Sequence, residues 1–258
     1  MRIMRTDSIE LEASRMEGLS VDYYPLMHER HRIFPELFEQ RDHKNILDIS
    51  AGMGIVAKRI KDSYPCTLSC NEVDETCLKQ LGKLQVNLSS FDLDSTEALP
   101  VADNSYDAIV CLATIEHLVN IDHFITELHR ILHDTGRLYL SVPNYAAFYW
   151  MIPLIMGKTF HDPLDPKSRY EFYAHIRYFT YRTLIEYMEH FGFTVDTVYL
   201  PLPEGSTHFM EIKSRSKVLA YLIRNFFRLL YIASPRWHQE PVVCFAKNYS
   251  GKMKKVIL

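Results

Sequence analysis

The sequence lacks the cysteine pattern of a disulfide-rich or metal-ribbon protein. Its 258 residues include only five cysteines and no Cys-x-x-Cys pair. An odd, scattered set in a chain of this size argues against a disulfide framework. We therefore expect the thiols to be buried apolar groups in a reducing compartment.

An excess of charge and a long apolar run are also missing. The chain has 29 Lys+Arg against 32 Asp+Glu, a formal charge of −3, so a nucleic-acid partner is disfavoured. No stretch reaches the roughly 18 charge-free apolar residues of a membrane span, and residues 1–7 contain no apolar signal core. These absences predict a cytoplasmic protein.

The composition that is present favours a single α/β domain with elaborations. A hydrophobic content of 47% supports a buried core in a chain of this length. We expect an N-terminal arm and lid helix over residues 1–40 and one domain over residues 41–258. Within that domain, an aromatic-rich cap insertion is expected at about 145–178 and an amphipathic helix at about 216–233.

The strongest local signal is a short apolar run followed by two glycines, at residues 45–57. This pattern predicts a strand, a tight turn and a helix whose unpaired N–H groups face a ligand. The spelling Gly-x-Gly-x-x-Ala also fits a dinucleotide loop. Asp48 decides between the ligands, because it would repel a pyrophosphate and attract an ammonium and a sulfonium. S-adenosylmethionine (SAM) carries both cations.

Two further carboxylates follow predicted strands. Glu72 comes about twenty residues after the glycine loop, the usual spacing for a ribose contact, although it could instead cap the helix predicted at 74–84. Asp92 ends the strand predicted at 85–91 and suits the adenine amino group, with Asp94 in reserve. The predicted cofactor-binding residues are Asp48, Ile49, Ser50, Ala51, Gly52, Gly54, Glu72, Val73, Asp92, Leu93, Leu112 and Tyr24.

Candidate residues for an acceptor lie later in the chain. Glu116 and His117 follow the strand predicted at 108–112, at the edge where parallel sheets bind ligands. His117 and His175 are the candidate general bases, since imidazole titrates near neutrality. The predicted substrate residues are Glu116, Asn144, Tyr145, Tyr149 and Arg177. The insertion that supplies several of them could equally be a self-packed cap.

The order of these signals resembles the class I SAM-dependent methyltransferases, in particular their broad small-molecule group. The matching segments are residues 47–54, Glu72, Asp92, 99–100, 106–107, 116–118, 136–138, 142–144 and 175–180. The resemblance implies a Rossmann-like, seven-stranded, mostly parallel sheet with helices on both faces. Ser50 departs from the family pattern, which usually has glycine at this position. The serine side chain narrows the space for a ligand.

The resemblance implies methyl transfer from SAM, and we expect O-methylation of a small-molecule or glycan-linked acceptor. The glycan preference rests on analogy with families that carry the His-x-Arg-x-Phe-Thr stretch found at residues 175–180. The alternatives are a non-catalytic SAM-binding protein and an NAD-type oxidoreductase, which Asp48 disfavours. Glu116, His117 and His175 resemble part of the magnesium site of some methyltransferases. Ala113 stands where those sites have a further carboxylate, so we expect no metal.

Two segments have open roles. The helical spacing between residues 21 and 40 predicts either a lid with Tyr24, His28 and Arg30 over the cofactor or a helix that covers one sheet edge. The helix at 216–233 is too short and too charged to span a bilayer. Its basic stripe suits peripheral contact with an anionic membrane, and its apolar faces suit packing within the chain or in a homodimer.

Overall fold

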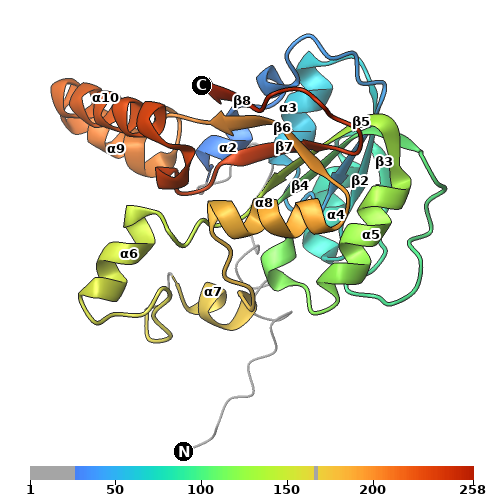
Figure 1. Cartoon of the computed structure of the whole chain (residues 1–258), viewed down its shortest axis with the longest axis horizontal. Coiled ribbons are helices and arrows are strands. Elements are labelled where there is room, and N and C mark those ends of the chain that lie inside the picture. Colours follow the sequence, from blue (N-terminus) through green and yellow to red (C-terminus); the bar gives the residue numbers. More distant parts are fainter. Residues whose placement is uncertain (1–26, 166–167) are drawn as a thin grey trace, which may run out of the picture.

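A computed structural model describes residues 27–165 and 168–258, in which one eight-stranded sheet organises the chain (Figure 1). The strand order is β3-β2-β1-β4-β5-β7-β6-β8. The strands are β1 Asn45–Ile49, β2 Thr67–Asn71, β3 Asn87–Ser89, β4 Tyr106–Leu112, β5 Leu132–Ser141, β6 Thr194–Leu200, β7 Val242–Ala246 and β8 Lys254–Ile257. The sheet is mostly parallel, as predicted, but β8 gives it eight strands where seven were expected.

Helices cover the sheet and extend from one end of it. The α-helices are α2 Glu29–Arg32, α3 Ile55–Ser63, α4 Glu75–Gly82, α5 Ile121–Ile131, α6 Phe148–Ile155, α7 Arg169–Ala174, α8 Tyr181–His190, α9 Thr207–Arg215 and α10 Lys217–Ala233. Short 3-10 turns lie at η1 Glu36–Phe38, η2 Ile115–His117 and η3 Pro235–Trp237. Helix α9 was not predicted.

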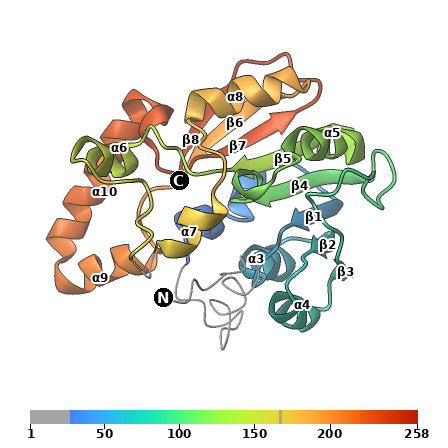
Figure 2. The ribbon, with the colours of Figure 1, turned by 90° about the horizontal axis from the view of Figure 1, so that it is seen from below.

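Two apolar clusters, one on each face of the sheet, hold these layers together. On one face α5 contributes Phe124 and Leu128, and α8 contributes Leu184 and Met188. On the other face α3 packs through side chains such as Ile60. Figure 2 shows α5 and α8 on one side of the strands and α3 on the other. Helices therefore cover both faces, as the apolar stripes of these segments predict.

The central strands run parallel and end at one edge. β1 lies between β2 and β4, with Ile46 opposite both Leu68 and Ala108. Four of the five residues of β1 are buried, which is typical of a parallel strand covered on both faces. The order of the strands reverses at β1 and β4, and such a reversal creates a crevice beyond the carboxyl ends of the strands.

Strand β7 runs against its neighbours. It pairs antiparallel with both β5 and β6, so that Leu140 lies opposite Val243. The start of β7 therefore lies at the edge where β1, β4 and β5 end. Residues just before β7 are brought to the crevice by this reversal, a consequence that local sequence signals do not reveal.

The described part of the N-terminal region packs on the sheet and contains two short helices in place of one long helix. Within the described residues the predicted helix at 21–40 is replaced by α2 and η1, which are separated by a turn at Pro35. Phe34 and Phe38 are fully buried beside Tyr139 of β5. Tyr24 lies outside the described residues.

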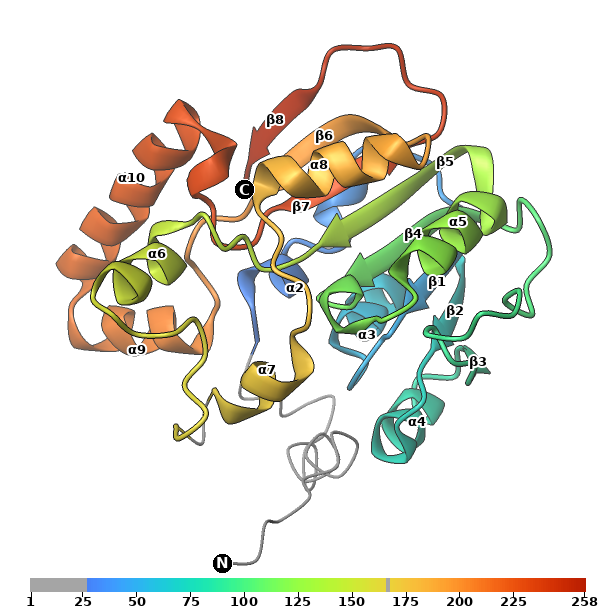
Figure 3. The same cartoon turned by 60° about the horizontal axis from the view of Figure 1, so that its bottom comes forward.

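The insertion and the C-terminal helices form the remaining side of the molecule. The insertion holds α6 and α7, and Figure 3 shows α6, α9 and α10 gathered at the same end. The predicted amphipathic helix is α10, with Ser216 as its N-cap. In the described part of the chain, no helix combines the length and apolar character that a bilayer crossing requires.

Candidate active site

A cavity of about 1190 Å³ opens at the carboxyl ends of the central strands. Its wall combines the glycine loop after β1, the ends of β2 and β4, the region of α2, and the cap formed by α6 and α7. Single small-molecule sites usually enclose about 300–1000 Å³. The cavity therefore has room for a cofactor and an acceptor together.

The glycine loop turns sharply between β1 and α3. Ser50, Gly52 and Gly54 have φ angles of 57°, 52° and 80°, all in the left-handed region. The Ala51 N–H donates to the Asn71 carbonyl at 3.1 Å, which ties the loop to β2. A side chain at Gly52 would meet no atom within 4 Å, so the loop leaves open space at this point.

Asp48 ends β1 beneath this loop and is almost completely buried. Its Oδ2 atom has no hydrogen-bond partner among the described residues. Burial, and secondarily the charge of Glu72, raises the pKa of the Asp48 carboxyl to about 7. A cation placed beside this group would favour the ionised carboxylate and satisfy it.

Glu72 connects the end of β2 to the glycine loop. Its Oε2 accepts a hydrogen bond from Gly52 N–H at 2.7 Å, and its Oε1 accepts from Val73 N–H at 2.8 Å. Burial raises the pKa of the Glu72 carboxyl despite these bonds. The helix that follows is capped by Asp74, which accepts from Cys77 N–H, so the alternative role of Glu72 as that cap is wrong.

The third predicted carboxylate, Asp92, also lies on the cavity wall, followed by Leu93. Asp92 Oδ1 accepts from Asp94 N–H at 2.9 Å. Asp94 instead holds the loop before α5, where its Oδ1 accepts from Asn120 N–H at 2.6 Å. Asp48, Glu72 and Asp92 thus all line the cavity, whereas Asp94 does not.

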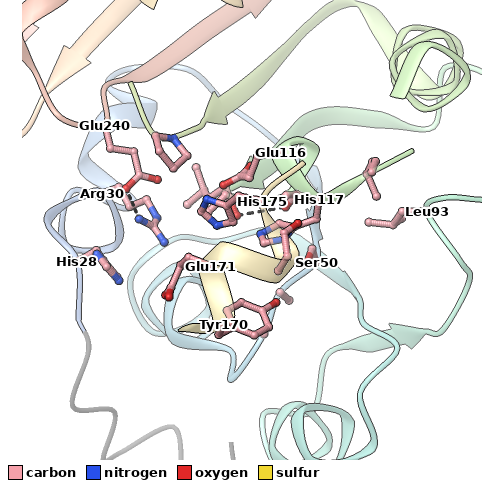
Figure 4. A pocket seen from close by; sticks show the side chains of 18 of the residues that line it. His28, Arg30, Ser50, Leu93, Glu116, His117, Tyr170, Glu171, His175 and Glu240 are labelled. Carbon is pink, nitrogen blue, oxygen red and sulfur yellow. Dashed lines mark hydrogen bonds and ion pairs between the residues drawn. The ribbon is translucent and has the colours of Figure 1, made fainter. Parts of the chain in front are cut away.

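A second polar group lies further along the wall, and we call Glu116, His117 and His175 the Glu-His-His cluster (Figure 4). One ligand-type atom from each of the three side chains lies within 4.8 Å of the others. His117 Nδ1 donates to the Ala174 carbonyl at 3.1 Å. His175 Nδ1 lies 2.8 Å from the Tyr145 hydroxyl. Both candidate bases are therefore held in defined orientations.

Glu116 is the least accessible member of the cluster. It is 0% exposed, and neither carboxylate oxygen has a hydrogen-bond partner in the described part of the chain. Burial raises the pKa of the Glu116 carboxyl to about 8, and the charge of Glu240 adds to the effect. Its main-chain carbonyl accepts from Ile176 and Arg177 N–H, which fixes the chain after α7 against η2.

Three of the predicted substrate residues do not line the cavity. Asn144 is buried. Its Nδ2 donates to the carbonyls of Arg236 and His238 and its Oδ1 accepts from Tyr181 N–H, so it links three segments of the main chain. Arg177 donates to the Val119 carbonyl.

Tyr145 is buried between His161 and His175, so any effect it has on an acceptor is indirect. The structure does not support direct substrate contact by these three residues, whereas Glu116 and Tyr149 line the wall.

The predicted cofactor residues divide in a similar way. Those on the wall are Asp48, Ser50, Ala51, Gly52, Glu72, Val73, Asp92, Leu93 and Leu112. Ile49 packs in the core, because successive residues of a strand point to opposite faces, and Gly54, the N-cap of α3, has no side chain to reach the wall. Their contacts with the cofactor stay predictions.

Sequence reasoning did not single out Glu240 and Glu171, which line the wall. It placed Trp150, His161 and Tyr170 in the aromatic insertion that could form the acceptor pocket but did not assign them to the site. Glu240 forms an ion pair with Arg30, a residue predicted for the lid, and both line the cavity with His28 (Figure 4). The sequence signal that points to Glu240 is its place just before β7, and it is informative only once β7 is known to be antiparallel.

Comparison with known proteins agrees with this architecture. The family model described as a methyltransferase domain matches residues 20–198. The ubiquinone/menaquinone biosynthesis C-methyltransferase UbiE of Geotalea uraniireducens is 34% identical over 113 residues, which are 40% of this chain and 48% of the relative. The malonyl-[acyl-carrier protein] O-methyltransferase of Geobacter sulfurreducens is 31% identical over 135 residues, 49% of this chain and 50% of the relative. The chain thus spans about half the length of these curated relatives.

A solved structure with the same fold is a SAM-dependent methyltransferase of Thermotoga maritima, described as a possible histamine N-methyltransferase. It superposes with a TM-score of 0.58 at 14% identity, covering 85% of this chain and 89% of the other. The likeness shows the fold alone, whereas the family model spans more than half of the sequence. The chain therefore belongs to the methyltransferase-domain family, and it has the fold of the class I SAM-dependent methyltransferases, whose cofactor is SAM.

Proposed function

We propose that this protein transfers the methyl group of SAM to a hydroxyl oxygen of a small-molecule or glycan-linked acceptor. The observation that carries this proposal is that one cavity is lined by two different sets of polar groups. One set is the three carboxylates with the glycine loop, and the other is the Glu-His-His cluster. The relatives are named for C-methylation and O-methylation, so the oxygen target rests on the imidazoles of this chain.

The three carboxylates and the glycine loop fit SAM. Asp48 offers a buried oxygen without a partner to a cationic group, and Gly52 leaves the loop open. Glu72 and Asp92 would bind the ribose and the adenine amino group. SAM supplies an electrophilic methyl group on a sulfonium. An NAD-type dinucleotide fits less well, because its pyrophosphate would lie beside Asp48.

The protein itself has to align the acceptor with that methyl group and remove the acceptor's proton. A neutral imidazole can accept a hydroxyl proton near neutral pH. His117 and His175 line the cavity from two different elements, η2 and the segment after α7, and their rings lie side by side with centroids 4.7 Å apart. We assign proton removal to one of these two histidines.

Calorimetry and turnover test this function separately. We expect wild-type protein to bind SAM and its demethylated product, and not NAD. Turnover on a panel of hydroxyl acceptors should fall about 10²-fold or more in H117A or H175A, with SAM affinity retained, because general-base catalysis contributes roughly 10²–10⁴-fold. Binding of NAD in place of SAM would reject the function. Wild-type turnover in both histidine variants would reject the assignment of the base, and SAM binding without turnover on any acceptor would favour the non-catalytic alternative.

We further propose that the acceptor is presented at an anionic membrane surface, which suits a lipid-linked substrate. Helix α10 exposes Val218, Leu222 and Leu229, and its charged residues, Lys217, Arg224 and Arg228, are all basic. Helix α6 exposes Ile152, Leu154, Ile155 and Met156 at the same end of the molecule (Figure 3). Apolar and basic side chains together favour a membrane over a second copy of the chain, whose α10 would bring like charges together.

Vesicle co-sedimentation tests this surface. We expect binding to vesicles that contain anionic lipid and little binding to neutral vesicles. Replacing Leu222 and Leu229 by Ser should weaken binding, and replacing the exposed Leu164 of the cap by Ser is the matched control. No binding to anionic vesicles would reject the proposal, and a dimer in solution that L222S and L229S disrupt would assign the helix to self-association.

A further inference from the structure

The side chain of Glu116 is unusual among the buried groups of this protein. It is completely inaccessible, and both of its oxygens are without a partner in the described residues. A carboxyl group in such a position is costly, and buried polar groups without a protein partner often indicate a bound water or ion. Glu116 is also among the residues that line the cavity, so only a small movement of its neighbours would expose its carboxylate to an ion there.

The two histidines beside Glu116 are arranged like metal ligands. His117 Nδ1 contacts the Ala174 carbonyl and His175 Nδ1 contacts the Tyr145 hydroxyl, at 3.1 and 2.8 Å. When Nδ1 donates a hydrogen bond to an oxygen, the proton stays on Nδ1. This fixes the tautomer in which the opposite nitrogen, Nε2, carries a lone pair. Each histidine therefore has a ring nitrogen that can bind an ion, and one ligand-type atom from each of the three side chains lies within 4.8 Å of the others.

We propose that Glu116, His117 and His175 bind a divalent transition-metal ion of the zinc class. Two imidazoles and one carboxylate are typical of zinc and its neighbours, whereas magnesium and calcium prefer oxygen ligands throughout. Ligands held about 2.1 Å from one ion lie about 3.4 Å apart in a tetrahedron, so these atoms have to close by at most about 1.4 Å. The sequence analysis predicted no metal, because Ala113 leaves a carboxylate missing from the magnesium pattern that Glu116, His117 and His175 partly match. An ion of the zinc class does not need that carboxylate.

Tyr145 holds the His175 ring in the orientation that a metal requires. Its hydroxyl lies 2.8 Å from His175 Nδ1 and 2.9 Å from His161 Nε2. If His175 donates from Nδ1, the hydroxyl accepts that bond and donates its own proton to His161. This directed chain keeps the proton on His175 Nδ1 and leaves Nε2 for the ion. Tyr145 is thus a positioning residue, which accounts for its place behind the cavity wall.

Three protein ligands leave at least one coordination position for an exchangeable group. Because all three ligands line the cavity, that position is open to an acceptor. With the ion bound, His117 and His175 would be ligands and could not accept the acceptor's proton, so the histidine base assigned above applies to the metal-free protein. The ion would instead bind a hydroxyl or carboxylate oxygen of the acceptor and lower the pKa of a bound hydroxyl, whose proton would leave to solvent. This substrate role rests on the proposed methyltransferase function, whereas ion binding does not.

Metal titration of the full chain, stripped with a chelator, tests the site. We expect one Zn²⁺ per chain by calorimetry and one Co²⁺ by its visible absorption, with Mg²⁺ much weaker. H117A, H175A and E116Q should each lower the affinity at least tenfold. Y145F should lower it about 10–100-fold, as losing a supporting partner usually does. H190A, which removes an exposed histidine of α8, is the matched control and should bind as wild type.

Circular dichroism checks that each variant is folded, and E116Q and Y145F remain informative if an imidazole variant unfolds. The proposal is overturned if wild-type protein binds neither Zn²⁺ nor Co²⁺ at one per chain, or if the folded cluster variants bind as tightly as H190A. SAM titration of the same samples separates the two proposals. SAM binding without metal binding rejects the ion alone, and metal binding without SAM binding rejects the proposed function alone.

Discussion

The buried carboxyl of Asp48 suits a cationic ligand but lowers the stability of the ligand-free fold when it is ionised. Its carboxyl is almost completely buried, one oxygen lacks a partner in the described structure, and its pKa is raised to about 7. The folded, ligand-free protein therefore binds a proton that the unfolded chain releases near pH 4. This group contributes stability at low pH, and that contribution is lost as the pH rises through 7.

Substitution of Asp48 by Asn should remove this pH dependence. Between pH 5.5 and 8 the ligand-free wild type should lose about 2 kcal/mol of unfolding free energy that D48N does not lose. Urea unfolding at the two pH values measures the difference. D48N should also bind SAM more weakly. If D48N and wild type show parallel stability curves, Asp48 is ionised to the same extent in both states.

Ser50 is a residue whose backbone does not suit its side chain. Its φ of 57° is left-handed, where a side chain costs roughly 1–2 kcal/mol. S50G should raise the unfolding free energy by up to about 1 kcal/mol, since the greater freedom of glycine in the unfolded chain offsets part of the gain. Thermal unfolding measures this.

Q85G is the control for Ser50, because exposed Gln85 has a φ of 54° outside the cavity. Both variants should gain similar stability. Only S50G can alter SAM binding, and we expect that binding to be at least as tight as in wild type. A loss of SAM affinity in S50G would show that the serine hydroxyl holds the cofactor.

Residue positions were predictable from the sequence where they depend on neighbours along the chain. Asp48, Glu72 and Asp92 reach the cavity because each follows a parallel strand, and the alternation of strands and helices predicts that arrangement. Glu240 was not predictable in this way, because its position depends on the direction of β7. Asn144 follows a strand too, yet it turns toward the chain before β7 to pair with main-chain carbonyls.

At the scale of elements, strand β5 shows what the apolar pattern leaves out. It begins at Leu132, although its first residues, 132–136, include His133, Asp134 and Gly136 and lack the apolar pattern of a buried strand, and its register with β4 shifts between Tyr106 and Ala108. Gly136 lies within the shifted stretch. A Cβ there would lie 2.9 Å from the His133 carbonyl oxygen and 3.0 Å from that of Asp107, so the backbone leaves no space for a side chain.

Substitution of Gly136 by Ala should therefore destabilise the fold by about 1–3 kcal/mol, as overpacking usually does. The matched change is G82A in α4, where a Cβ meets nothing within 4 Å and should stabilise the helix by up to about 1 kcal/mol. Chemical unfolding compares the two. Neither residue lines the cavity, so folded protein should bind SAM normally in both variants. Equal stability of the two variants would contradict the close packing around Gly136.

The short elements were the least predictable. β3 covers only Asn87–Ser89 of the expected 85–91, because Phe91 N–H is taken by the Asn71 side chain and leaves the sheet. Helix α9 has a weakly apolar face with one buried residue, Phe209. Its position depends on packing against α10, and a local pattern does not record that contact.

For the whole molecule, two buried neutral histidines set the limit of acid stability. Burial lowers the pKa of His43 and of His238 to about 4. His238 donates from Nε2 to the Pro201 carbonyl and accepts at Nδ1 from Glu240 N–H, so both ring nitrogens are used in the neutral form. Protonation would break the second bond.

Because these folded-state pKa values lie below the ordinary 6.5, the stabilisation is complete above pH 6.5 and is lost as the pH falls toward 4. From pH 7 to pH 5, His238 alone should cost the wild type about 2 kcal/mol of unfolding free energy. H238Q should lose less over the same interval, although it starts less stable. Urea unfolding at pH 5 and 7 checks this, and an equal loss in both proteins would show that His238 is protonated in the folded state.

The order in which the chain builds its cavity has an evolutionary consequence. The predicted cofactor residues of the wall lie on β1 to β4 and in the loops that follow them, whereas much of the remaining wall comes from the α2 region, the cap and the segment before β7. The cap is one continuous stretch of sequence. Exchange of the cap alone would therefore alter the acceptor part of the cavity and leave the predicted nucleoside contacts in place.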